Sequence, residues 1–125
     1  IEAATMLDMA KKDILPAVTA YIKELADTAV AKKTFIPMCE CSYEEDIVAK
    51  ASALSSKLYS AVKELEDNMA KASEIGGITE LSMFYKDYII PSMDAVRAPA
   101  DELETITAKK YWPFPTYGDL LFGVR

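Results

Sequence analysis

The sequence contains no histidine, and this absence excludes several kinds of active site. Ser-His-Asp and Cys-His catalysis, the HExxH zinc motif and the Glu-x-x-His pairs of di-iron helical bundles all require imidazole. Glycine is also scarce, and the four glycines are isolated or in one pair, so no glycine-rich phosphate-binding loop is present. We therefore predict no catalytic and no cofactor-binding residue in this chain.

Basic residues are in the minority. Fourteen Lys and Arg stand against twenty Asp and Glu, which gives a net charge of −6. Because phosphate binding draws its affinity from clustered Lys and Arg, this balance argues against a nucleic-acid partner. No apolar run approaches the ~20 residues that span a bilayer, and no secretory signal is visible. We expect neither nucleic acid nor a membrane as a partner.

The only two cysteines, Cys39 and Cys41, lie one residue apart. This spacing is a poor geometry for a disulfide, so we expect free thiols and a cytoplasmic protein. Two thiols are also too few for a closed zinc site, which needs four ligands. Two acidic runs, 44–46 and 101–104, are typical of solvated first turns of helices rather than of a cation site. We predict no metal site.

Apolar residues recur every three or four positions over three segments, which predicts helices at about 1–34, 43–75 and 79–110. A capping box from Ser42 to Glu45 should begin the second helix, and Thr79 should cap the third. Strand signals are absent. Pro16 and Pro91 each fall inside a helical pattern, and they should kink the first and third helices. Pro99 is a candidate first residue of a further helix.

Three long amphipathic segments with short connections predict an all-α fold, an elongated antiparallel three-helix bundle with kinked helices 1 and 3. A thirty-residue helix is about 45 Å long. Residues 1–125 should form a single helical domain whose residues 111–125 are an extended aromatic C-terminal tail. Ile1 begins directly in helical sequence, so we expect a fragment of a larger protein. The methionines at helical spacing are interpreted as core filling. These are Met6, Met9, Met69, Met83 and Met93.

The tail reads YWPFPTYGDLLF over residues 111–122 and holds five of the twelve aromatic residues. Residues before proline are extended, and large aromatics each bury about 150–250 Å², so we expect this segment to pack rather than to float in water. Its partner is open: its own bundle, another domain or subunit, or a proline-recognition domain. We predict packing anchors at Trp112, Phe114, Tyr117, Leu120 and Phe122. We predict that the backbone path is set by Pro113, Pro115 and Gly118.

The tail closely resembles the C-terminal ending of type III glutamine synthetases. The helix FYKDYIIPSMDAVRAPADELET (84–105) resembles the same region. The segment MLDMAKKDILPAVTAYIKEL (6–25) resembles the stretch that follows the catalytic domain in that family. The resemblance covers nearly the whole chain, and the middle, 34–77, matches only as a generic helical hairpin.

The resemblance implies a parent enzyme that ligates ammonia to glutamate with ATP and a divalent metal, Mg or Mn, in large homo-oligomers of stacked rings. It implies that the catalytic residues belong to an upstream domain, so that none is carried over to this chain. The expected role here is structural, with the upstream catalytic domain and neighbouring subunits as partners. The alternative is a stand-alone helical module that docks on another protein through its tail or a bundle groove.

Overall fold

The computed structural model describes residues 2–114, and all regular structure among them is helical. The expected all-α class is confirmed. The first helical segment consists of α1 (Glu2–Asp8), the π-helical η1 (Met9–Ile14) and α2 (Leu15–Phe35). The second is the single helix α3 (Ser42–Ala72). The third consists of α4 (Ile78–Phe84), the π-helical η2 (Tyr85–Ile89) and α5 (Ile90–Ile106).

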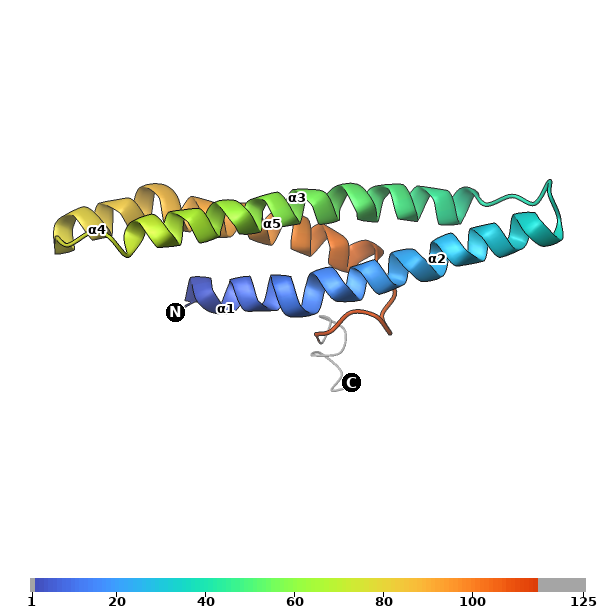
Figure 1. The fold of residues 1–125 in the computed structure, drawn as a ribbon, viewed down its shortest axis with the longest axis horizontal. Coiled ribbons are helices and arrows are strands. Elements are labelled where there is room, and N and C mark those ends of the chain that lie inside the picture. Colours follow the sequence, from blue (N-terminus) through green and yellow to red (C-terminus); the bar gives the residue numbers. More distant parts are fainter. Residues whose placement is uncertain (1, 115–125) are drawn as a thin grey trace.

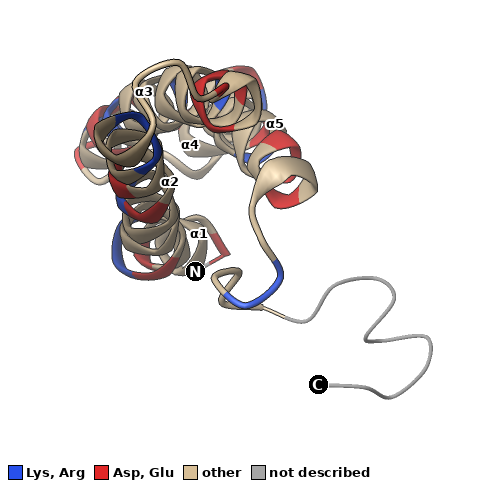
Figure 2. Cartoon of the chain, turned by 90° about the vertical axis from the view of Figure 1, so that its right-hand side faces the viewer, with Lys and Arg blue, Asp and Glu red and all other residues tan. Residues whose placement is uncertain are grey.

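The long helix α3 lies at the centre of the arrangement. It packs against α2 on one side and α5 on the other, and the chain reverses at the loop 36–41 and again between α3 and α4 (Figure 1). Seen end-on, α3 lies between α2 and α5, while charged residues of both signs occur on all three helical segments (Figure 2). The shape is elongated, because each segment spans six or more helical turns.

The core follows the apolar stripes of the three segments. Small and branched residues allow close approach, and Val18, Leu58 and Ile89 have no exposed surface. Burial of each such side chain contributes about 1.5–3 kcal/mol to the stability of the fold, so the three apolar stripes are its main source of stability. The other fully or nearly fully buried members include Ala3, Ala10, Ala51, Val62, Leu65, Val96 and Leu103.

Each predicted kink site carries a π-helical turn just before its proline. The N–H of Leu15 bonds to the carbonyl of Ala10, and that of Ile90 bonds to Tyr85, five residues back in both cases. A proline cannot donate to the carbonyl four residues earlier, and a wider turn accommodates that missing bond.

The π turn also changes which side chains face the core. We expected Tyr85 and Tyr88 on the apolar face, but they are 39% and 54% exposed. A five-residue bond shifts the helical phase relative to a regular 3.6-residue period, so Ile89 rather than the tyrosines is buried. Met83, predicted as core filling, is 59% exposed, and no residue of α4 is buried.

The predicted N-cap residues of two helices are wrong. Gly77, not Thr79, is the N-cap residue of α4, and Cys41, not Ser42, is that of α3. Neither cap makes a side-chain hydrogen bond; the Ser42 hydroxyl instead donates to Glu40. Pro99 does not begin a helix but lies buried inside α5.

The acidic run 101–104 also lies inside α5, near its C-terminal end, rather than in a first turn.

Candidate docking site around the aromatic segment

The chain turns sharply after α5 and so brings the aromatic residues back to the helices. Thr107 has extended backbone angles, and the N–H groups of Tyr111 and Trp112 both donate to the carbonyl of Ala108, at 2.9 and 3.2 Å. These bonds form a tight turn at the base of the tail. The positions of Tyr111 and Trp112 are therefore fixed by backbone hydrogen bonds.

Tyr111 attaches the turn to α2. Its hydroxyl donates to Glu24 Oε1 at 2.9 Å, and its ring lies 5.4 Å from that of Tyr21, centroid to centroid. Lys110 Nζ approaches the same carboxylate at 3.4 Å. The hydrogen bond from its hydroxyl to Glu24 raises the pKa of Tyr111, because it favours the protonated phenol.

Tyr21 is the buried residue against which the Tyr111 ring packs. It is 4% exposed, and its hydroxyl lies 3.2 Å from that of Tyr43 on α3. Burial raises the pKa of Tyr21 to about 12, and the hydrogen bond with Tyr43 acts in the same direction. The three tyrosines thus connect the tail, α2 and α3.

Trp112 and Phe114 face the opposite side of the turn, toward α1 and α5. Their rings meet edge to face with centroids 6.4 Å apart, and both pack, half-buried, against the hydrophobic core. Together they form one wall of a cavity of about 250 Å³, called the tail cavity below. The other lining residues come from α1, η1 and α5: Met6, Met9, Ala10, Ile14, Val96, Arg97, Ala100, Asp101 and Glu104.

The structure places only part of the predicted tail. Trp112 and Phe114 contact the core and Pro113 is exposed between them. Five predicted residues lie outside the described part of the chain: Pro115, Tyr117, Gly118, Leu120 and Phe122. Tyr111 was not predicted as an anchor, although its place beside Trp112 in the aromatic run was a signal.

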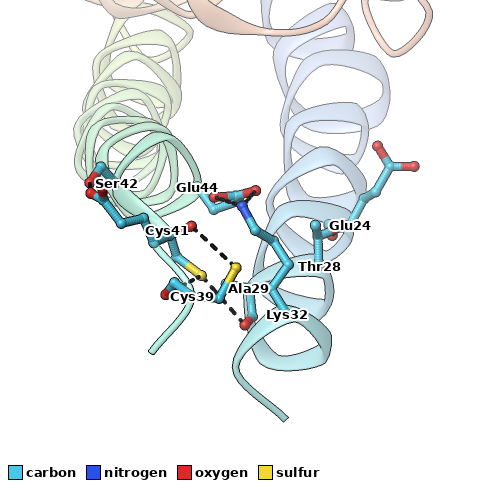
Figure 3. Close-up of polar contacts among 9 residues, drawn as sticks. Glu24, Thr28, Ala29, Lys32, Cys39, Cys41, Ser42 and Glu44 are labelled. Atoms are coloured by element: carbon cyan, nitrogen blue, oxygen red, sulfur yellow. Dashed lines mark hydrogen bonds and ion pairs between the residues drawn. The ribbon is translucent and has the colours of Figure 1, made fainter. Parts of the chain in front are cut away.

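A second polar cluster, absent from the predictions, lies where α2 meets α3. Lys32 Nζ reaches both carboxylate oxygens of Glu44, at 3.0 and 3.3 Å, and Glu44 is 6% exposed (Figure 3). Glu44 lies in the first turn of α3, as expected, but its side chain is buried and not solvated. The hydrogen bond from Lys32 holds the pKa of Glu44 below its usual value.

The two cysteines lie beside this ion pair as free thiols. Cys41 is buried, and its thiol points to the carbonyl of Ala29 at 3.7 Å (Figure 3). Within residues 2–114, no three His, Cys, Asp or Glu side chains come together in a group able to hold a metal ion. No helix in this part of the chain is long and apolar enough to cross a membrane.

Comparison with known proteins agrees with the resemblance seen in the sequence. Residues 1–34 match the model of the glutamine synthetase C-terminal domain. The chain is 31% identical over its full length to a glutamine synthetase of Butyrivibrio fibrisolvens, covering 18% of that protein. It is 29% identical to the type-3 glutamine synthetase of Dictyostelium discoideum, with 98% of the chain aligned over 17% of that protein. No solved structure matches it.

The chain is thus a homologue of glutamine synthetases, as the sequence resemblance predicted. The matching family model is that of the C-terminal domain, and the chain spans less than a fifth of the length of the relatives it matches.

Proposed function

We propose that this chain is the C-terminal helical domain of a cytoplasmic type III glutamine synthetase, with a structural role in assembly. The parent enzyme would ligate ammonia to glutamate with ATP and a divalent metal, Mg or Mn. The observation that carries this proposal is the similarity of 98–100% of this chain to part of two glutamine synthetases, one of them of type 3. We propose that the catalytic residues lie in an upstream domain of the enzyme, as the resemblance to the family's C-terminal region implies.

We infer that the domain acts as a rigid spacer in the enzyme. We infer an elongated antiparallel three-helix bundle whose first and third helices bend at Pro16 and Pro91. The extensive packing of α3 against both neighbours and the π turns before both prolines support this arrangement. An elongated bundle of this kind can contact other proteins at both of its ends, which suits a role in assembly.

Exposed apolar residues at these ends support protein contacts. Phe35 and Met38, at the loop between α2 and α3, are 85% and 90% exposed. Ile78, at the start of α4, is 85% exposed, and no residue of α4 is buried. Clustered exposed apolar side chains mark sites of protein association. We propose that the loop-end patch, Phe35, Ile36, Met38 and Tyr43, contacts a neighbouring subunit or the catalytic domain of the same oligomer.

The tail is proposed as the second structural element. We infer that its anchors are Trp112, Phe114, Tyr117, Leu120 and Phe122, with Pro113, Pro115 and Gly118 setting the backbone path. The packing of Trp112 and Phe114 on the core supports this role.

The ligase assignment is tested by expressing the complete reading frame that encodes this chain. We expect the whole protein to form glutamine from glutamate, ammonia and ATP in the presence of Mg²⁺. The 125-residue chain alone should form none under the same conditions. A complete protein without this activity would contradict the assignment.

A further inference from the structure

The tail cavity is a partly open, mostly apolar site, and no described side chain fills it. Its walls are Met6, Met9, Ile14, Val96 and the rings of Trp112 and Phe114, while charges occur only at Arg97, Asp101 and Glu104. A cavity of about 150 Å³ lined by apolar side chains binds benzene. The tail cavity, at about 250 Å³, therefore has room for a phenyl ring together with part of an aliphatic side chain.

We propose that this cavity is the receptor for the chain's own C-terminal segment and takes up Leu120 and Phe122. Phe114 is part of the cavity wall, so the chain leaves the described region directly at the site. The six residues that lead from Phe114 to Leu120 reach at most about 20 Å when extended. This length is enough for Leu120 to return to the cavity, because Phe114 itself lines it. The short connection also gives the segment a high effective concentration at the cavity.

The chemistry of the segment matches that of the cavity. Leu120, Leu121 and Phe122 are consecutive apolar residues, and burying one such side chain is favourable by about 1.5–3 kcal/mol. The segment also carries one acid, Asp119, and one base, Arg125.

The charges lining the cavity are likewise of both signs. Arg97 approaches Asp94 only at 3.8 Å and is half exposed, so its guanidinium has donors to spare for a carboxylate. Asp101 and Glu104 are available to a cation from the segment.

Docking in this way would close the hydrophobic core with residues of the same chain. It extends the proposed anchoring role of the tail, and it does not depend on the ligase activity of the parent. A failure of this proposal would leave the glutamine-formation test unaffected, and the reverse also holds.

The experiment uses the full 125-residue chain, whose single tryptophan, Trp112, reports directly on the cavity. We expect Leu120→Ser/Phe122→Ser to shift Trp112 fluorescence to longer wavelength and to increase its quenching by acrylamide. Circular dichroism should show unchanged helix content. Thr116→Ala, a change at a polar position of the same segment, is the matched control and should leave the fluorescence unchanged. Equal fluorescence in the double variant and the wild type would overturn the proposal.

A second experiment fills the tail cavity with a bulky side chain, so that the C-terminal segment can no longer enter it. Ala100 lines it, whereas Ala98 is exposed on the same helix. In the wild type, amide hydrogen exchange over residues 117–122 should be protected. Ala100→Phe should remove this protection, and Ala98→Phe should keep it.

Absent protection in the wild-type chain would assign the segment to the rest of the enzyme and overturn docking within the chain. A different result is protection that depends on protein concentration, together with a dimer detected by light scattering. That result would mean that the cavity binds the C-terminal segment of a second copy, and it would also overturn docking within the chain.

Discussion

Lys32 and Glu44 form an ion pair between α2 and α3 in which the carboxylate is buried and the ammonium is partly exposed. The ammonium group lies 3.0 Å from one carboxylate oxygen, and the Glu44 side chain is 8% exposed while that of Lys32 is 36% exposed. A pair that is shielded from water keeps more of its Coulomb attraction, but leaving either partner alone costs the desolvation of a charge. The pair therefore fixes how the two helices meet next to the loop 36–41.

Replacing Glu44 by Gln should lower the thermal midpoint at pH 7 because it leaves Lys32 without its partner. Glu44 has a pKa below its ordinary value of 4.5, chiefly because Lys32 donates to it. Since its pKa is lower in the folded than in the unfolded state, its stabilisation is present above 4.5 and is lost as the pH falls through the folded pKa. The difference between wild type and Glu44→Gln should therefore narrow below that pH.

Circular dichroism melts across pH measure this effect, and Glu45 provides the control. Its carboxylate meets Lys33 at 3.1 Å, but both side chains are at least half exposed. Exposed ion pairs contribute little, so Glu45→Gln should have a small effect at every pH. If Glu44→Gln and Glu45→Gln lowered the thermal midpoint equally at pH 7, the Lys32–Glu44 pair would contribute no more to stability than an exposed ion pair.

Tyr21 should ionise well above the usual pH for a tyrosine side chain. Its pKa of about 12 is above the ordinary 10.0, so its contribution to stability is full below pH 10 and is lost as the pH rises through 12. Absorbance titration of the phenolate should show a late transition that disappears in Tyr21→Phe and persists in Tyr59→Phe, an exposed site. Complete ionisation near pH 10 in the wild type would contradict the buried tyrosine contact.

Ile89 and Ile90 are adjacent, yet one is fully buried and the other is 52% exposed. Ile89→Ala should destabilise the chain by about 2–5 kcal/mol, the usual cost of a large-to-small change in a core. Ile90→Ala should cost much less. Urea unfolding measures both changes, and similar losses would mean that the π turn at η2 does not set the helical phase.

Trp112→Ala should destabilise the isolated chain by about 2 kcal/mol, less than the ~3–5 kcal/mol of a fully buried tryptophan, because the side chain is only half-buried. Phe35→Ala is the control: its side chain is 85% exposed, so the change should stay within about 0.5 kcal/mol. Chemical unfolding followed by circular dichroism compares them. A loss no greater than that of Phe35→Ala would show that Trp112 does not pack on its own helices.

The sequence predicts the helices well because apolar spacing reports directly on a buried helical face. It did not predict the exposure of Tyr85 and Tyr88, since a regular period takes no account of a π turn before Pro91. The burial of Glu44 was also missed, because local spacing contains no information on a partner twelve residues away.

For the tail, apolar content predicts that the segment packs. The choice of surface depends on the turn at Ala108 and on Tyr111, which only the structure reveals.

The central claim is that this domain serves assembly in a larger enzyme. Its most direct test is the mass of the complete protein by light scattering after Phe35→Ser/Met38→Ser in the loop-end patch. Tyr59→Ser, an exposed site on α3 outside the patch, is the control. We predict that the patch variant forms smaller assemblies while the control keeps the mass of the wild type. An unchanged mass for the patch variant would contradict the account.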